Sequence, residues 1–344
     1  MNRTTKLILL PLISALLFSG HQARADLVVL QYHHVDDSTP AATSTSRSLF
    51  EAQIDMIGNL DLEVVALKKG TLAALDDAHP DTNEIAITFD DAYESVHRYA
   101  APLLNKRDMP YTLFVNTDAI GTPGYMSWEQ LRELAGNPLV TIANHSAGHD
   151  HLVKRPGEPE NDWEQRVAAS LDIAQNVLKN QLGVEEPLFA YPYGEFDQAL
   201  EQKLEERGWL GFGQQSGAIG PFSGKTRLPR FPMANAYGQL GSLKDKLMSK
   251  GFPVPAETLP DGVITQNPPT LQLTPSDAIQ PSRLTCFASG LGRIEFSVAG
   301  NDIKVRAPKA INSRRFRYNC THPAGNGSFY WLSQQWLNLN VPED

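Results

Sequence analysis

Two neighbouring aspartates end an apolar run in "EIAITFDDAYES". If residues 84–90 form a buried strand, successive side chains point to opposite faces, so Asp90 and Asp91 cannot serve the same purpose. A second segment, "NHSAGHDH", supplies His145 and His149, whose spacing puts both imidazoles on one side of a helical turn. Two histidines and one aspartate leave positions on a divalent metal open for water and substrate. The sequence therefore indicates a catalytic metal site.

Several other polar groups also fall where predicted strands end. In the strand assignment below, the carboxyl ends of different strands carry His33, Asp90, Asp91, His145 and Tyr193. Barrel enzymes build their active sites from that rim of the barrel. The shared position of these residues is therefore itself a signal of function.

The first part of the chain has the pattern of an α/β protein. From Leu27 to about Pro232, short apolar runs such as "LVVLQYH", "YTLFVN" and "LFAYPY" alternate with helical stretches such as "SLFEAQIDMIGNL". Continuous apolar strands separated by amphipathic helices predict parallel strands covered by helices. The number of repeats favours a distorted or incomplete (β/α) barrel over an open sheet.

The composition of the sequence changes after the predicted barrel. We expect a barrel over residues 26–255, a linker over 256–267, and a small antiparallel, sandwich-like β-domain over 268–344; the stretch "ITQNPPTLQLTPSDAIQPS" at this boundary is rich in Pro, Thr, Ser and Gln. The two cysteines, Cys286 and Cys320, both fall in this last part. In an exported chain they predict one disulfide, with two buried free thiols as the alternative.

The chain begins as a secretory signal peptide does. Arg3 and Lys6 precede an apolar stretch over 7–18, and Ala23 and Ala25 form an A-x-A cleavage pattern. The apolar stretch is shorter than the ~20 residues of a membrane-spanning helix. We therefore expect residues 1–25 to be removed, a periplasmic or secreted protein, and no stable membrane span.

The charge excludes one class of partner. The net charge is −9, and it becomes −12 without the signal, which holds three basic residues and no acidic one. An acidic chain without a basic run is a poor candidate for binding nucleic acid.

Three segments together resemble the polysaccharide deacetylase family, the fourth family of carbohydrate esterases. "TFDDAYES" is similar to its first motif, T-F-D-D-G, with Ala92 in place of the glycine, and "HSAGH" matches H-[ST]-x-x-H. "FAYPYGEFD" is similar to R-x-P-Y, but Ala190 stands where many members have arginine. The resemblance covers roughly residues 27–233. It implies a distorted (β/α) barrel that uses a divalent metal, most often zinc, to hydrolyse N-acetyl or O-acetyl groups on sugars.

The resemblance also implies roles for individual residues. Asp90 matches the catalytic base, and Asp91, His145 and His149 match the metal ligands. Pro192 and Tyr193 match the third motif, in which the Tyr193 N–H would stabilise the oxyanion. Since Ala190 replaces the arginine beside the base, we take Arg230 in "LPRFP" as a possible substitute.

The general acid is the least determined role. The family's late motif contributes a histidine, and "RLPRFPMAN" contains none. The segment "QYHHV" resembles the Y-H-x-V of members that act on poly-N-acetylglucosamine, so we assign His33 as the acid and expect Tyr32 to contact the substrate. His34 is expected to be structural, and His151 is a spare candidate for the acid.

These observations predict a metal-dependent deacetylase of an N-acetylated glycan, such as poly-N-acetylglucosamine or a chitin-like oligosaccharide. Two alternatives within the family act on O-acetylated xylan or on peptidoglycan. A glycosidase with two carboxylates would leave the histidine pair without a role. The last alternative is a catalytically inactive barrel that binds glycan.

Overall fold

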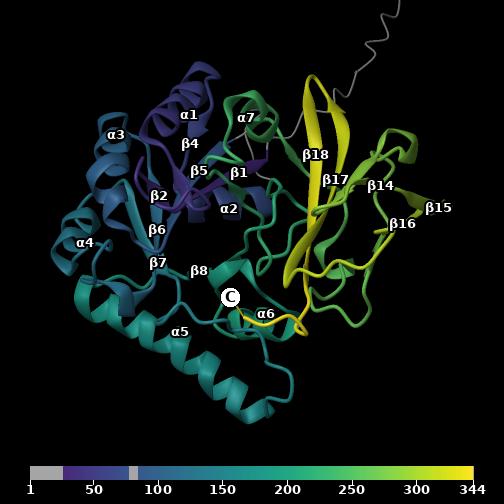
Figure 1. Cartoon of the computed structure of the whole chain (residues 1–344). Helices are drawn as coiled ribbons and strands as arrows, with labels where there is room; N and C mark the ends of the chain where they lie inside the picture. The colour runs from purple at the N-terminus through teal and green to yellow at the C-terminus, as the bar shows by residue number, and fades with distance from the viewer. Residues whose placement is uncertain (1–25, 77–83, 344) are drawn as a thin grey trace, which may run out of the picture.

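A curled parallel sheet forms the first part of the protein (Figure 1). The computed structural model describes residues 26–76 and 84–343, so the predicted signal peptide lies outside the described residues. In spatial order the strands are β10 (Phe231–Pro232), β1 (Leu27–Tyr32), β5 (Glu84–Asp90), β6 (Tyr111–Val115), β7 (Val140–Asn144), β8 (Leu188–Ala190) and β9 (Leu210–Phe212), with β4 (Glu63–Val64) beside β5. The central strands are buried along their length, which accounts for their continuous apolar sequences.

Helices cover the outer face of this sheet. They are α1 (Arg47–Asn59), α2 (Leu67–Leu75), α3 (Ala101–Lys106), α4 (Trp128–Ala135), α5 (Glu160–Leu182), α6 (Gln198–Glu205) and α7 (Leu240–Leu247). The strands β2 (His34–Val35) and β3 (Ser44–Thr45) form a separate pair between β1 and α1. None of the helices in the described ranges is both long and apolar enough to cross a membrane.

One segment connects the two edges of the curled sheet. Leu228 bridges Phe212 of β9, and two residues later Arg230 leads into β10, which pairs with β1. This curled, incompletely closed sheet with surrounding helices confirms the predicted distorted barrel.

The C-terminal part contains two sheets whose strands are antiparallel, as predicted, except that the short strand Lys250–Gly251 pairs in parallel with its neighbour. One sheet contains β11 (Lys250–Gly251), β18 (Ser328–Leu337), β17 (Arg315–Gly325), β13 (Thr285–Ala288) and β14 (Gly292–Ile294); the other contains β12 (Thr270–Leu273), β16 (Asp302–Arg306) and β15 (Phe296–Ala299). Cys286 and Cys320 lie directly opposite each other on β13 and β17 and form the predicted disulfide. The two cysteines are 34 positions apart in the sequence. Because the disulfide lowers the conformational entropy of the unfolded chain, it stabilises the fold by about 4 kcal/mol on the chain-entropy model.

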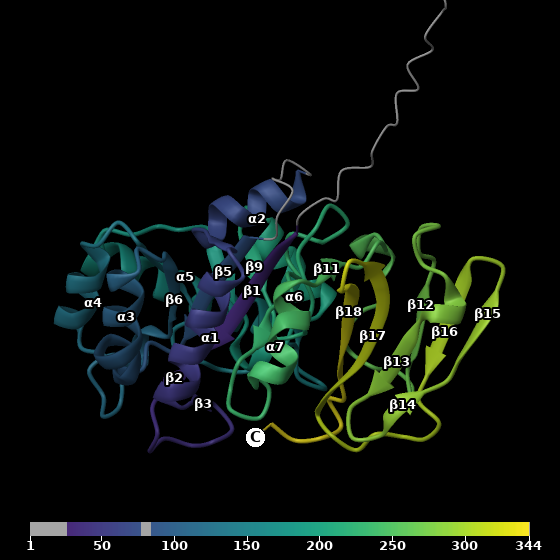
Figure 2. The ribbon, with the colours of Figure 1, turned by 90° about the horizontal axis from the view of Figure 1, so that it is seen from above.

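Strand β17 separates two environments because its side chains alternate. Phe316, Tyr318 and Cys320 face the apolar core of the β part, whereas Arg315 and Arg317 are on the opposite face. Figure 2 shows β17 and β18 lying between the barrel and the other sheet. The β part therefore presents the outer face of β17 and β18 to the barrel.

The junction is closely packed. The ring of Trp331 on β18 meets Phe231 of β10 edge to face, 5.1 Å between centroids. The expected linker is itself bonded along β18, since Leu337 donates to the Gly262 carbonyl and the Ile264 N–H donates back to Leu337. The predicted domain boundaries stay a prediction, but residues 256–267 are not a free tether.

Candidate active site

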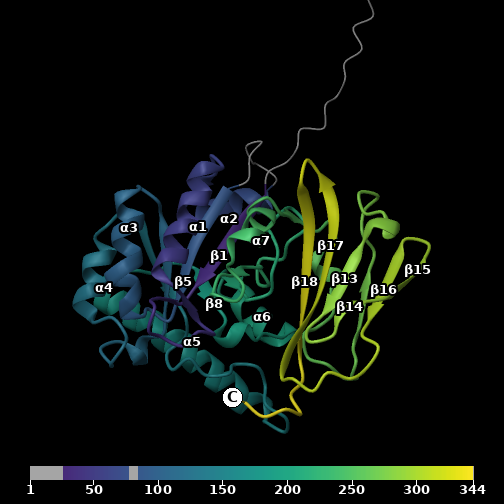
Figure 3. The ribbon, with the colours of Figure 1, turned by 45° about the horizontal axis from the view of Figure 1, so that its top comes forward.

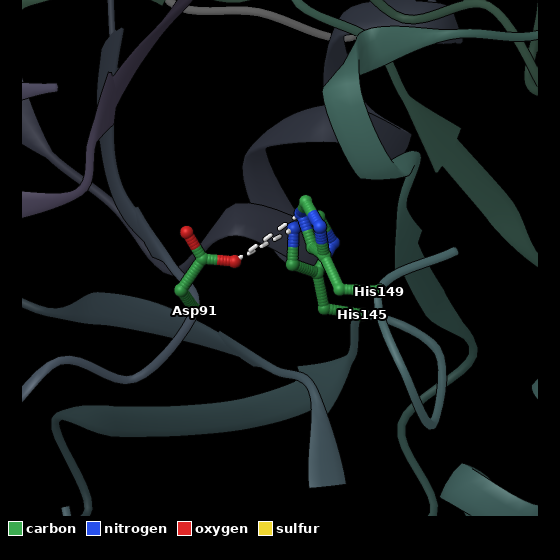
Figure 4. A group of neighbouring side chains, drawn as sticks. All are labelled: Asp91, His145 and His149. Atoms are coloured by element: carbon green, nitrogen blue, oxygen red, sulfur yellow. Dashed lines mark ion pairs between the residues drawn. The ribbon is translucent and has the colours of Figure 1, made fainter. Parts of the chain in front are cut away.

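Three predicted ligands meet at the carboxyl ends of two strands. Asp91 follows β5, and His145 and His149 follow β7. One carboxylate oxygen of Asp91 lies 3.4 Å from Nε2 of each histidine (Figure 4). Candidate ligand atoms from the three residues all lie within 4.8 Å of one another. The arrangement has the size and composition of a site for one divalent metal.

The chemistry of these atoms also fits a metal. Asp91 Oδ1 and His145 Nε2 are buried and have no hydrogen-bond partner among the described residues. His145 Nδ1 lies 2.7 Å from the Ala190 carbonyl, which can only accept, so Nδ1 carries the proton and Nε2 presents its lone pair. Burial, followed by the charge of His145, lowers the pKa of His149 to about 4, which keeps its imidazole neutral as a ligand must be.

Unusual backbone conformations hold the ligands. Asp91 has φ 72° and Ala92 has φ 58°, and on the other loop Ser146 and His149 have φ 67° and 56°. These values lie in the left-handed region, where glycine is favoured. The left-handed conformation of Ala92 explains why a glycine suits this position of the first motif. The left-handed conformations of Asp91 and Ala92 also turn the backbone sharply, so Asp91 no longer continues the direction of the strand.

Asp90 is held by a different set of partners. It is fully buried, and Arg230 donates Nη1–H to Oδ1 at 2.7 Å and Nη2–H to Oδ2 at 2.8 Å. Gln31 donates Nε2–H to Oδ2 at 2.7 Å. Burial opposes ionisation of Asp90, but the charges of Arg230 and His145 and the hydrogen bonds from Arg230 together outweigh it and lower the pKa to about 2. The structure thus places Arg230 against Asp90, although its role in catalysis stays a prediction.

His33 shares this corner of the site. It lies between β1 and β2 and is partly exposed, with Nε2 3.9 Å from Oδ2 of Asp90. Its neighbour His34 is buried and stacks on Tyr93 at 3.5 Å between ring centroids. Since His33 is the more accessible of the two, it is the one that can reach a substrate.

Tyr193 lies over the histidine ligands. Its backbone is left-handed, with φ 58° and ψ 1°, and its ring packs edge-on against His149 with centroids 4.6 Å apart. His151 stacks on the same ring at 3.9 Å and only 3° from parallel. His151 is thus a packing partner of Tyr193, and its Nδ1 lies 2.9 Å from a carboxylate oxygen of Glu195.

The C-terminal part contributes a contact that the sequence interpretation missed. Glu195 is buried and accepts hydrogen bonds from Arg314 at 2.8 and 3.0 Å and from Arg315 at 3.0 Å. The Arg315 guanidinium also lies 5.3 Å from the centre of the Tyr193 ring. Only the position of Glu195, directly after "PYG", hinted at this network, because its partners lie about 120 residues away.

One predicted substrate contact must be corrected. Tyr32 is buried, packs against Phe50 and Phe89, and donates its hydroxyl to Gln53 of α1. The reason is strand alternation: Gln31, its neighbour on β1, points to Asp90, so Tyr32 must point to the helix layer. Pro192 is also buried and shapes the turn before Tyr193.

The fold and site together define a class. A curled parallel sheet whose rim carries an Asp–His–His group beside a buried, ionised carboxylate has the layout of a barrel hydrolase.

Comparisons with known proteins show what the barrel is similar to. The polysaccharide deacetylase family profile matches residues 77–210. A putative polysaccharide deacetylase of Bacillus subtilis, YxkH, is 26% identical over 207 residues, which are 60% of this chain and 71% of that protein. A poly-beta-1,6-N-acetyl-D-glucosamine N-deacetylase of Staphylococcus epidermidis is 27% identical over 54% of this chain and 66% of its own length.

Solved structures agree with these matches. IcaB from Ammonifex degensii superposes with a TM-score of 0.56 at 27% identity, covering 64% of this chain and 94% of IcaB. The Streptococcus pyogenes deacetylase PplD, at 19% identity and a TM-score of 0.54, supports the fold alone. Along its barrel the chain is therefore similar, in sequence and in fold, to polysaccharide deacetylases, which are hydrolases.

The buried pair of Asp90 and Arg230 gives a first prediction. Arg230→Gln leaves a buried carboxylate unpaired and should lower the free energy of unfolding by about 3–5 kcal/mol. Adding Asp90→Asn removes that charge, so the double variant should lose less than the two single variants together, by about 1–3 kcal/mol. Urea unfolding of the metal-free proteins gives the four free energies of this double-mutant cycle. If the double variant loses as much stability as the two single variants together, the pairing is contradicted.

A surface pair supplies the control for this cycle. Arg47 and Asp37 also form an ion pair, but both side chains are about half exposed. Arg47→Gln should therefore leave the urea midpoint nearly unchanged, unlike Arg230→Gln.

The network around Glu195 predicts a pH dependence. Burial opposes ionisation of Glu195, but hydrogen bonds from His151 and Arg314 lower its pKa to about 2. A carboxyl group whose pKa is lower in the folded state than in the unfolded state stabilises the fold at pH values above the unfolded-state pKa. This stabilisation is lost as the pH falls through the folded-state pKa. Glu195→Gln should therefore cost about 3–5 kcal/mol at pH 7, and this deficit should shrink as the pH falls from about 5 to 2.

Glu343→Gln is the matched control, since Glu343 lies 3.9 Å from the same Arg314 but is partly exposed. It should change stability by less than about 1 kcal/mol. A deficit of Glu195→Gln that stayed constant across this pH range would show that its charge is not the cause.

Proposed function

We propose that this protein is a metal-dependent deacetylase that removes acetyl groups from an N-acetylated polysaccharide or oligosaccharide and releases acetate. The observation that carries the proposal is the group Asp91, His145 and His149, which offers buried ligand atoms of the correct type beside the ionised Asp90. Zn²⁺ is the metal that best suits two imidazoles and one carboxylate.

The substrate is proposed from the relatives and from the first strand. Several relatives are named as deacetylases of poly-beta-1,6-N-acetyl-D-glucosamine. The "QYHHV" segment, with His33 beside Asp90, supports the same class of substrate. We therefore propose poly-N-acetylglucosamine or a chitin-like glycan, with peptidoglycan and O-acetylated xylan as the substrates to be excluded.

The residues divide the work by position. When bound, a divalent metal lowers the pKa of a coordinated water from 15.7 to about 7 and polarises the acetyl carbonyl. Asp90 accepts the proton from the attacking water, and Arg230 and Gln31 hold its carboxylate in one orientation. Because its pKa is low, Asp90 is ionised at neutral pH and ready to accept.

Two further groups complete the reaction. The Tyr193 N–H donates to the oxyanion, from a turn that the neighbouring imidazoles hold in place. His33 donates a proton to the amine nitrogen as the C–N bond breaks. The products are acetate and a free amino group on the sugar.

Export is part of the same proposal. The disulfide is typical of an oxidising compartment, and a polysaccharide outside the cell requires an enzyme outside the cytoplasm. We propose that residues 1–25 direct the chain to the periplasm or the exterior.

The first test is acetate release from the four candidate glycans with and without a chelator. Acetate should appear from the N-acetylglucosamine polymer, disappear with EDTA and return with added Zn²⁺. Asp91→Asn should lose bound metal and activity together, because it removes a negatively charged ligand. Activity that persists in metal-free protein would overturn the mechanism, and shortened chains without acetate would indicate a glycosidase.

A second test addresses the acid. His33→Gln should lower kcat by about 10²- to 10⁴-fold while the protein keeps its metal and its melting temperature. His97→Gln is the control, because His97 lies on the outer surface and pairs with Glu133. Full activity of a folded, metal-loaded His33→Gln protein would assign the proton to another group.

A further inference from the structure

A cleft of about 730 Å³ lies between the barrel and the C-terminal β part. The barrel supplies Tyr237 and Lys246, from α7 and the loop before it, and the β part supplies Phe287, Arg317 and Asn319. Figure 3 shows α7 beside β18 and β17, at the junction that contains this cleft. Its volume is in the range of ~300–1,000 Å³ that small-molecule sites occupy.

Two exposed aromatic side chains face this cleft. Tyr237 is 59% exposed and Phe287 is 41% exposed. Among the described residues, only one further aromatic side chain, Phe222, is this exposed. The C–H faces of sugar rings pack on such aromatic surfaces, whereas single exposed aromatics scattered over a surface carry no such meaning.

The cleft also holds a cationic side chain, Arg317. In the part of the chain that the structure describes, no carboxylate pairs with the Arg317 guanidinium and no acceptor takes a hydrogen bond from it. Burial and the positive charge of Arg315 lower the pKa of Arg317, although Tyr237 acts in the opposite direction. A ligand rich in hydrogen-bond acceptors would satisfy these donors.

Strand β17 runs from the candidate active site to the cleft. Arg315 lies over the Tyr193 ring, and Arg317 is the next residue on the same face of β17, about 7 Å further along. On the barrel side, Gln214 lies against Gly194, and Ser216, two residues on, lines the cleft. A chain that passes Tyr193 can therefore follow β17 into the cleft.

We propose that this cleft binds the neighbouring sugar units of an N-acetylated oligosaccharide whose reacting acetamide lies at Asp91, His145 and His149. The proposal rests on the proposed function for the identity of the sugar. Tyr237 and Phe287 pack against the rings, Arg317 donates to acetamide carbonyls, and Asn319 binds hydroxyl groups. The β part is then a specificity element that favours long substrates over short ones.

The test compares β-1,6-linked N-acetylglucosamine hexamer and dimer. Calorimetry with the chelator-treated full chain measures binding without turnover. Tyr237→Ala and Phe287→Ala should each weaken hexamer binding by about 10-fold, or about 1.4 kcal/mol, because each removes one contact between a ring and a sugar. In the metal-loaded protein, each should lower the ratio of hexamer to dimer kcat/KM by about 10-fold.

Val298→Ala is the control, since Val298 is 47% exposed on β15 of the same β part and does not line the cleft. Melting temperatures verify that each variant folds. Hexamer binding that depends on Tyr237 and Phe287, without acetate release, would support the cleft and refute the proposed function. If the protein releases acetate but Tyr237→Ala and Phe287→Ala bind the hexamer as well as Val298→Ala does, the cleft proposal is refuted and the proposed function stands. Binding of a sulfated oligosaccharide in place of the hexamer would overturn the ligand class.

Discussion

The bidentate contact between Arg230 and Asp90 is the constraint on which the site depends. Both side chains are fully buried, and a buried carboxylate is tolerated only when its charge and lone pairs are matched. The partner comes from the segment that connects the two edges of the curled sheet. Closing the sheet and fixing the orientation of Asp90 are therefore one structural event. Ala190, at the motif position where many members have arginine, instead offers its carbonyl to His145.

This arrangement separates the two adjacent aspartates by chemistry as well as by direction. Asp90 ends the strand with its oxygens taken up by Arg230 and Gln31, which preserves its charge at neutral pH. Asp91 turns away through a left-handed conformation and meets His145 and His149 with an oxygen that has no hydrogen-bond donor among the described residues. One carboxylate thus has both oxygens occupied by donors and the other keeps one oxygen available, as the proposed base and metal ligand require.

The C-terminal part is tied to the same site through ion pairs. Arg314 and Arg315 reach Glu195, which orients His151 against the Tyr193 ring. The turn that carries Tyr193 is consequently held from both sides of the junction. One face of β17 supplies both Arg315 at this turn and Arg317 in the cleft, so the β part contacts both places.

The sequence by itself determined the alternating strands and helices, the two-part chain, the disulfide and the Asp–His–His group, because local periodicity and short motifs encode them. It also marked Arg230 and His33 as candidates near the site. It did not place Tyr32 in the core, since one position along a strand decides which face a side chain takes. Nor did it reveal the pairing of Glu195 with Arg314, the use of Gln31, or the cleft beside Arg317. These depend on contacts between residues far apart in the chain, and such contacts exist only once the sheet has curled and the β part has packed against it.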